Sequence, residues 1–221
     1  MRFVPSKSLR TFCQGVENFK STLIAYLCRN ALLLAVLFCM FIAGIIFGSM
    51  GVVFLDVAQK KEIAFFVDRV FKENIATPNA NTLLASAILN IKLIAVVWFL
   101  GLTVVGIPLV AIIVFTRGFA LGFTSAFLIT LKGTSGIATV ILTLLPPNIF
   151  YVPLLIFAAA SSIVFSLCLI KSAHAEVSLS KNFLAYTLLM IIIACAGGVI
   201  GALQSLLSPY AVKAVFLTYR R

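Results

Sequence analysis

Uncharged apolar runs constrain the fold of this sequence more than any other feature. Residues 31–55, 93–116 and 182–207 each lack a charged side chain. An α-helix needs about 20 predominantly apolar residues to cross the hydrocarbon core of a bilayer, so each run is long enough for one crossing. The chain is also 62% hydrophobic and only 10% charged, which is too apolar for a soluble domain. The sequence therefore predicts an all-α, polytopic integral membrane protein with four to six hydrophobic helices.

The middle of the sequence is harder to divide into crossings. The uncharged run over residues 118–131 is too short to cross, and the run over 133–170 is too long for one simple span. Pro146 and Pro147 lack amide donors and are expected to divide the longer run. One interpretation is a broken or re-entrant helical pair before the prolines, followed by one crossing after them. The other interpretation places Arg117 within the membrane and gives two complete crossings, and the sequence leaves both open.

Basic residues mark the two ends of the chain. Residues 1–29 hold five cations and one acid, and residues 213–221 hold three cations. By the positive-inside rule we expect 1–29 to be a cytoplasmic basic segment, 30–212 a membrane domain and 213–221 a basic tail. We favour four complete crossings with the tail also in the cytoplasm, whereas two complete crossings in the middle region would place it outside. Because the cations are separated by apolar runs, they predict contact with the lipid bilayer and no nucleic acid.

A short amphipathic segment follows the first long run. Residues 56–79 carry four cations and four acids, and they are expected outside if the N-terminal segment stays inside. Apolar residues recur there on one face at helical spacing. The charges prevent a crossing, so the segment should lie on the outer membrane surface or dock against a partner. The predicted docking face consists of Ile63, Phe66, Val67, Val70 and Phe71.

Small residues recur at helical spacing in the first and last runs. Such faces let another membrane helix approach closely, because no side chain separates the two backbones. The sequence predicts close helix contacts at Gly44, Gly48 and Gly51, and at Gly197, Gly198, Gly201 and Ala202.

Groups that carry chemistry are sparse. All six acidic residues lie outside the apolar runs, which does not fit proton-coupled transport or an intramembrane aspartyl protease. The five cysteines are scattered and His174 is the only histidine, so no zinc site is expected. Residues 133–136 read GTSG and match the GxSG of rhomboid-type proteases, but that chemistry needs a nearby histidine base. We expect a protein that is not an enzyme, with no catalytic residue, metal or cofactor.

Two stretches carry motifs of a known family. Residues 101–129 contain a glycine–hydrophobic–proline element and then an arginine–glycine element that ends in Gly-Phe. Residues 144–167 contain Leu-Pro-Pro-Asn and a further proline. In this order and spacing the chain resembles the stage II sporulation protein M family. The matching positions are Gly106, Pro108, Arg117, Gly118, Gly122, Phe123, Leu145, Pro146, Asn148 and Pro153.

The resemblance implies a non-enzymatic membrane scaffold of endospore formation. It would act in engulfment of the forespore, at the septal and engulfing membrane of the mother cell. The implied partners are stage II sporulation proteins D and P, which degrade peptidoglycan and which the scaffold would recruit. An alternative is a transporter or channel for a small molecule or ion, with Arg117 and the broken helical region forming a substrate site. The sequence leaves the oligomeric state open, and a homo-oligomer is compatible with either function.

Overall fold

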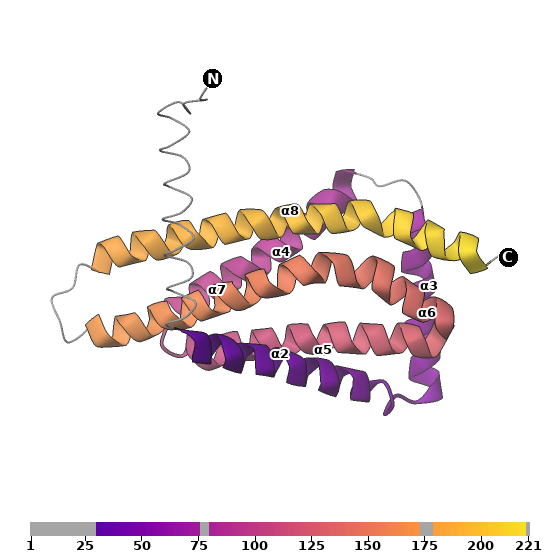
Figure 1. Cartoon of the computed structure of the whole chain (residues 1–221), viewed down its shortest axis with the longest axis horizontal. Coiled ribbons are helices and arrows are strands. Elements are labelled where there is room, and N and C mark those ends of the chain that lie inside the picture. The colour runs from indigo at the N-terminus through magenta and orange to yellow at the C-terminus, as the bar shows by residue number, and fades with distance from the viewer. Residues whose placement is uncertain (1–29, 76–79, 173–178, 220–221) are drawn as a thin grey trace, which may run out of the picture.

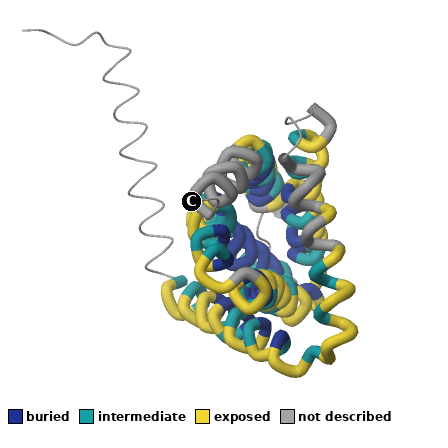
Figure 2. Tube along the Cα trace, turned by 90° about the vertical axis from the view of Figure 1, so that its right-hand side faces the viewer, coloured by how far each residue is buried: buried dark blue, intermediate teal, exposed yellow. Residues whose placement is uncertain are grey.

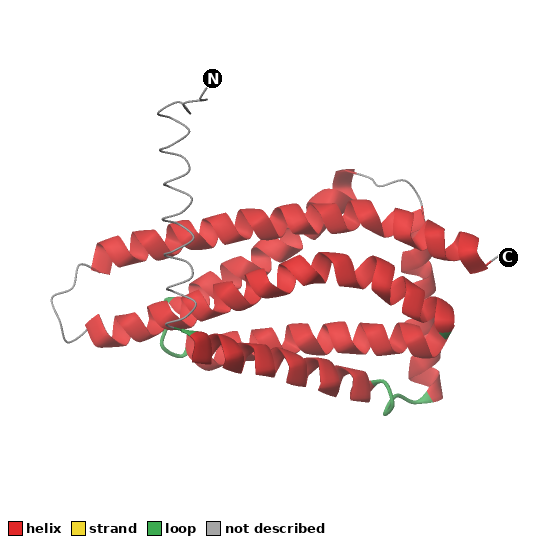
Figure 3. Cartoon of the chain, viewed as in Figure 1, coloured by secondary structure: helices red, strands yellow, loops and turns green. Residues whose placement is uncertain are grey.

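The computed structural model describes residues 30–75, 80–172 and 179–219, and its regular elements in these ranges are all helical (Figure 3). A bilayer offers no water to backbone amides, so a crossing segment satisfies them within its own helix. The elements in chain order are α2 (Ala31–Gly51), α3 (Val57–Ile75), α4 (Ala80–Gly101), α5 (Gly106–Lys132), α6 (Thr134–Thr139), the π-helix η1 (Val140–Leu144), α7 (Leu145–Ser172) and α8 (Leu179–Tyr219).

Five helical stretches in the described part of the chain are long and apolar enough to cross a membrane. They are Ala31–Gly51, Thr82–Gly101, Gly106–Leu131, Thr134–Ile170 and Phe183–Leu206. Successive stretches run in opposite directions and form an up-and-down bundle (Figure 1). Buried residues lie between the helices and exposed residues face outward (Figure 2), and the exposed set includes many large apolar side chains, as lipid contact requires. The predicted all-α, polytopic membrane fold is confirmed.

The chain reverses inside an apolar stretch, between α4 and α5. Residues 102–105 connect the two helices. A Cβ on Gly106 would lie 1.8 Å from the carbonyl oxygen of Leu100, so this close reversal requires glycine. Pro108 lies in the first turn of α5, where a missing backbone donor costs little. The expected single crossing over 93–116 is therefore wrong, because the reversal divides that run between two helices.

The structure replaces the re-entrant interpretation with two complete helical stretches. α5 passes without a break through Arg117, and the chain then turns at Gly133, whose φ of 56° favours glycine. The following stretch remains helical through Pro146 and Pro147, by way of η1. A π-helical turn inserts an extra residue, and this accommodates positions that lack an amide donor. The expectation that the prolines end a re-entrant pair is wrong, and the other interpretation agrees with the structure.

α2 and α5 pack backbone to backbone. A Cβ on Gly44 or Gly48 of α2 would lie 2.3 or 2.1 Å from a carbonyl oxygen of α5. A Cβ on Gly118 or Gly122 of α5 would lie 2.2 Å from a carbonyl oxygen of α2. The predicted close contact is confirmed at Gly44 and Gly48. At Gly51 a Cβ would meet only phenylalanine side chains, at 3.6 Å.

α8 pairs with α4, and α7 lies inside the bundle. Residues 158–163 of α7 are all buried. Among them, the Ser162 hydroxyl donates to the carbonyl of Val97 on α4 at 2.9 Å. A Cβ on Gly201 of α8 would lie 2.7 Å from Nδ2 of Asn90 on α4, so the predicted small-residue contact of the last helix is confirmed there. These small residues let α7 and α8 approach α4 closely enough for polar groups to pair inside the membrane.

The contribution of one such hydrogen bond to stability can be measured at Tyr186 of α8. Its ring stacks on Phe165 of α7 with centroids 4.2 Å apart, and its hydroxyl donates to the carbonyl of Trp98 at 3.0 Å. Tyr186→Phe keeps the stacking and should lower the free energy of unfolding by about 0.6 kcal/mol, a typical value for interhelical hydrogen bonds. Tyr186→Ala should lower it by about 3 kcal/mol, because it also empties the ring site. Unfolding in mixed detergent micelles measures the free energy of unfolding of the two variants. Equal losses in the two would show that the Tyr186 ring contributes nothing beyond its hydrogen bond.

α3 runs across one end of the bundle, where α6 and the C-terminal end of α8 also lie (Figure 1). The prediction of a helix over the amphipathic segment is confirmed by its bounds, Val57–Ile75. If each of the five apolar stretches crosses once, this end lies on one side of the membrane and the start of α2 on the other. The described apolar stretches number five, whereas the favoured arrangement has four crossings, so the side on which the C-terminal tail lies stays a prediction.

Candidate functional site

Arg117 lies near the middle of α5 and so near the middle of a stretch that is long and apolar enough to cross a membrane. It is about 17 Å along the helix axis from the start of α5, and the hydrocarbon core is about 30 Å thick. Its side chain shares a helix face with Leu121 and Thr124, which line the same cavity. The adjacent face carries Gly118 and Gly122, which contact α2. The α2–α5 contact thus directs Arg117 into the bundle, toward α4 and α7.

Two polar side chains from neighbouring helices hold the Arg117 guanidinium. Its Nη2 donates to Oδ1 of Asn90 on α4 at 3.3 Å and to the hydroxyl of Tyr151 on α7 at 3.2 Å. The Tyr151 ring centroid also lies 5.1 Å from the guanidinium carbon, within the range of a cation–π contact. Asn90 in turn donates to the carbonyl of Gly197 on α8 at 3.2 Å. The cluster therefore connects α5 to α4, α7 and α8.

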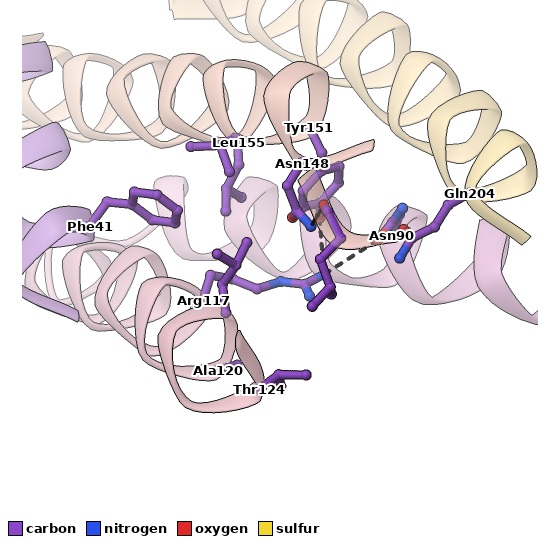
Figure 4. A pocket seen from close by; sticks show the side chains of 12 residues that line it. Phe41, Asn90, Arg117, Ala120, Thr124, Asn148, Tyr151, Leu155 and Gln204 are labelled. Atoms are coloured by element: carbon purple, nitrogen blue, oxygen red, sulfur yellow. Dashed lines mark hydrogen bonds between the residues drawn. The ribbon is translucent and has the colours of Figure 1, made fainter. Parts of the chain in front are cut away.

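A cavity of about 160 Å³ lies beside the guanidinium (Figure 4). A space of this size can hold a few water molecules or one small polar group. Its polar lining consists of Asn90, Arg117, Thr124, Asn148, Tyr151 and Gln204, and its apolar lining consists of Phe41, Ala120, Leu121, Leu144, Val152 and Leu155.

The polar lining is not evenly distributed. Phe41 and Leu155 lie toward one end of the cavity, and the guanidinium reaches away from them toward Asn90 and Gln204 (Figure 4). Gln204 belongs to the last turn of the apolar stretch of α8, which ends at Leu206. The polar side of the cavity therefore extends from the middle of the membrane toward the end of the bundle at which α3 lies.

The crossing helices contain no carboxylate that could balance Arg117. The sequence has no acidic residue between Glu73 and Glu176, none after Glu176 and none in α2. Within the described part of the chain, Nε of Arg117 is buried without a hydrogen-bond partner. Arginine does not lose its proton in proteins, and an unpaired charge at this depth is costly. The site therefore holds a permanent positive charge between neutral partners, beside a cavity.

Two of the motif residues, Arg117 and Asn148, come together at this cavity. Asn148 donates to the carbonyl of Leu144 at 2.7 Å, which leaves its own carbonyl oxygen at the lining. Gly118 and Gly122 form the contact with α2 and so orient α5.

The other motif residues shape the helices around the site. Gly106 and Pro108 lie at the reversal between α4 and α5. Phe123 stacks on its neighbours one turn away on α5, with ring centroids 6.2 Å apart on each side. Pro146 lies in the first turn of α7 and Pro153 within α7, and each removes a backbone donor there.

Of the predicted docking face on α3, the structure describes only the side chain of Ile63, which is half-buried. On the opposite side of α3, Phe65 is 67% exposed, and the Arg69 guanidinium carbon lies 5.3 Å from its ring centroid. The face therefore stays a prediction. Four of its side chains lie outside the described residues: Phe66, Val67, Val70 and Phe71.

Sequence reasoning missed four residues of the site: Asn90, Thr124, Tyr151 and Gln204. The available signal was their polarity inside apolar runs, since a polar side chain at membrane depth is expensive unless it has a partner or a role. Asn90 shows this most clearly, because two apolar residues precede it and Ile91 follows it in the stretch Thr82–Gly101. Which of these side chains meet depends on the order in which the helices pack.

Groups for acid–base or metal chemistry do not gather in the described part of the chain. It contains no cluster of three or more His, Cys, Asp or Glu that could hold a metal ion, and Cys39, Cys168 and Cys195 form no disulfide there. His174 lies outside the described residues. The GTSG sequence forms the turn at Gly133 and the start of α6. What the Arg117 site offers a bound group is a positive charge and hydrogen-bond donors.

One comparison with known proteins identifies a family. The model for stage II sporulation protein M matches residues 34–205 of the chain. Neither the search of curated proteins nor the search of solved structures found a match. The matched region contains the α4–α5 reversal, the α2–α5 glycine contact and every residue that lines the Arg117 cavity. The chain belongs to the stage II sporulation protein M family, and this membership implies a role in sporulation.

Proposed function

We propose that this protein is a non-enzymatic scaffold that holds peptidoglycan-degrading partners at the septal membrane of the mother cell during engulfment of the forespore. The observation that carries the proposal is the family match over residues 34–205. The proposed partners are stage II sporulation proteins D and P. Five apolar stretches that can anchor the chain in a membrane support a scaffold role.

α3 is the element best suited to meet a partner outside the bilayer. It carries charges of both signs, which keep it out of the hydrocarbon core, and it runs across one end of the bundle (Figure 1). If residues 1–29 are cytoplasmic, the first crossing places α3 on the outer side, where the cell wall lies. A partner that degrades peptidoglycan works on that same side.

The docking face of α3 can be tested with aspartate substitutions. Phe66→Asp with Val70→Asp should abolish recruitment of the two partners, because docking would have to desolvate two new charges. The measurement is capture of purified stage II sporulation proteins D and P by the variant in nanodiscs, together with their septal localisation in sporulating cells.

Phe65→Asp is the matched control. It places one aspartate on α3, at a residue that is 67% exposed and on the opposite side of the helix. It should leave partner capture unchanged. Normal capture by the double variant, with normal insertion in the membrane, would contradict the docking face.

A transporter or channel is the second candidate, and the cavity beside Arg117 favours it. The two functions make different predictions for the purified chain in liposomes. Specific capture of the hydrolases without solute flux supports the scaffold. Anion flux that disappears in Arg117→Gln would support the transporter.

A further inference from the structure

We propose that the cavity beside Arg117 is a binding site for one phosphate group, supplied either by the headgroup of an anionic phospholipid or by dissolved phosphate. This proposal does not depend on the scaffold role, because it is based on the contacts and charge of the site alone.

The positive charge of Arg117 is not balanced by an anionic side chain of the crossing helices. Arg117 is held by Asn90 and Tyr151, and both are neutral. No acidic residue occurs in any of the five crossing stretches. A permanent cation at mid-membrane depth is stabilised when an anion occupies the adjacent space, since Coulomb interactions are strong where the dielectric constant is low.

The hydrogen-bond donors of the site suit an oxyanion. Nε of Arg117 is buried without a partner in the described part of the chain, so the charge of the guanidinium is incompletely compensated by its neighbours. The Tyr151 hydroxyl accepts from Arg117, which leaves its own proton available to a ligand. Thr124 and Gln204 add a hydroxyl and an amide to the lining. A guanidinium with nearby neutral donors binds phosphate oxygens through charge-assisted hydrogen bonds.

The position of the cavity favours a ligand that enters from the membrane surface. Its polar lining continues from Arg117 to Gln204, close to the end of the α8 apolar stretch at Leu206. At the opposite end, Phe41 and Leu155 are buried apolar residues that separate the site from the other side of the membrane (Figure 4). A phosphate group can therefore reach the guanidinium from the α3 end while remaining in contact with polar side chains.

The size of the cavity limits what can bind. A volume of about 160 Å³ accommodates one phosphate group and little more. A phospholipid would place only its headgroup phosphate in the cavity, with its acyl chains in the surrounding bilayer.

The test uses the full chain in nanodiscs of zwitterionic lipid. One arm measures binding of inorganic phosphate by calorimetry. The other arm adds phosphatidylglycerol and uses native mass spectrometry to measure how much of it the released protein retains. Arg117→Gln should weaken binding in the arm that reports the true ligand by at least about tenfold, the usual effect of removing a charge-assisted partner.

Lys92→Gln is the matched control. Lys92 is the other lone cation inside a crossing stretch, it is exposed, and it does not line the cavity. Its substitution removes the same charge and should leave phosphate and phosphatidylglycerol binding unchanged.

Two further variants keep the test decisive if Arg117→Gln does not accumulate. Arg117→Lys keeps the charge and loses the planar donors, so binding should fall by an intermediate factor. Thr124→Leu fills part of the cavity from an exposed position on α5 and keeps Arg117, so binding should again fall.

The arms distinguish the two sources of phosphate. Calorimetric binding that depends on Arg117 identifies dissolved phosphate, and phosphatidylglycerol retention that depends on Arg117 identifies the lipid headgroup. The proposal is overturned if the wild-type protein binds neither probe, or if the Arg117 and Thr124 variants bind both as the wild type does. A cavity that holds only water would give this result.

Discussion

Gly48→Ala is expected to lower the free energy of unfolding by about 3 kcal/mol, the upper end of the cost of overpacking a well-packed contact. Alanine is the better helix former by about 1 kcal/mol, so the loss cannot come from the helix itself. It comes from the contact with α5, because the new Cβ would lie 2.1 Å from the carbonyl oxygen of Phe119. That atom is backbone and cannot rotate away. α2 must therefore move away from α5, which separates the contacts at Gly44, Gly118 and Gly122 as well.

Gly51→Ala provides the control on the same helix. A Cβ there would lie 3.6 Å from the Phe119 and Phe123 rings, which is ordinary van der Waals contact. The variant should be as stable as the wild type, or slightly more stable. Unfolding in mixed detergent micelles and the amount of protein in the membrane fraction measure both variants. Equal stability of the two would contradict the backbone-to-backbone contact between α2 and α5.

Much of the fold could be predicted from the sequence because the membrane imposes a simple rule. A crossing segment must be long, apolar and helical, and this identified the first and last crossings and the membrane class. The amphipathic helix was predicted from its periodicity, since α3 has apolar residues at helical spacing among charges. The glycine faces were predicted because small residues at helical spacing serve close packing.

The middle of the bundle could not be predicted, because there the chain reverses inside an apolar run and a charged residue lies inside a helix. The reversal at 102–105 lies in an apolar run, and its only marks are Gly106 and Pro108. The sequence left open whether Arg117 ends a crossing or lies within the membrane. It lies inside an apolar stretch that is long enough to cross, where Asn90 and Tyr151 compensate for part of the cost of its burial. That compensation involves residues far apart in the sequence, so neither spacing nor composition reveals it.

The same reasoning explains how much of the site was found. Arg117 and Asn148 were identified through the family motifs. Gln204 and Thr124 were not, because a single polar residue in an apolar helix has several ordinary explanations. Only the packing of α4, α5, α7 and α8 shows that these side chains line one cavity.

A reporter fused after Arg221 is expected to lie outside the cell, on the side opposite to residues 1–29. The five cations of that segment retain it in the cytoplasm. Each of the five apolar stretches then crosses once, and an odd number of crossings leaves the end of the chain outside. An alkaline phosphatase fusion, which is active only outside, should therefore be active at Arg221. It should also be active when inserted at Gly133 and inactive when inserted at Thr103, because these turns lie at opposite ends of the bundle.

The Arg221 fusion is the decisive one, because the charge of the tail predicts a cytoplasmic position and five crossings predict an outer position. Residues 213–221 carry three cations, which the positive-inside rule would retain in the cytoplasm. The stretch Phe183–Leu206 is uncharged over 24 residues, and a long apolar span can override such a bias. Activity at Gly133 with no activity at Arg221 would show that α8 does not cross. No activity at either position would support the four-crossing arrangement, in which α8 crosses and both positions lie on the cytoplasmic side. Activity at both positions would establish five crossings and place α3 and the end of α8 on the outer side together.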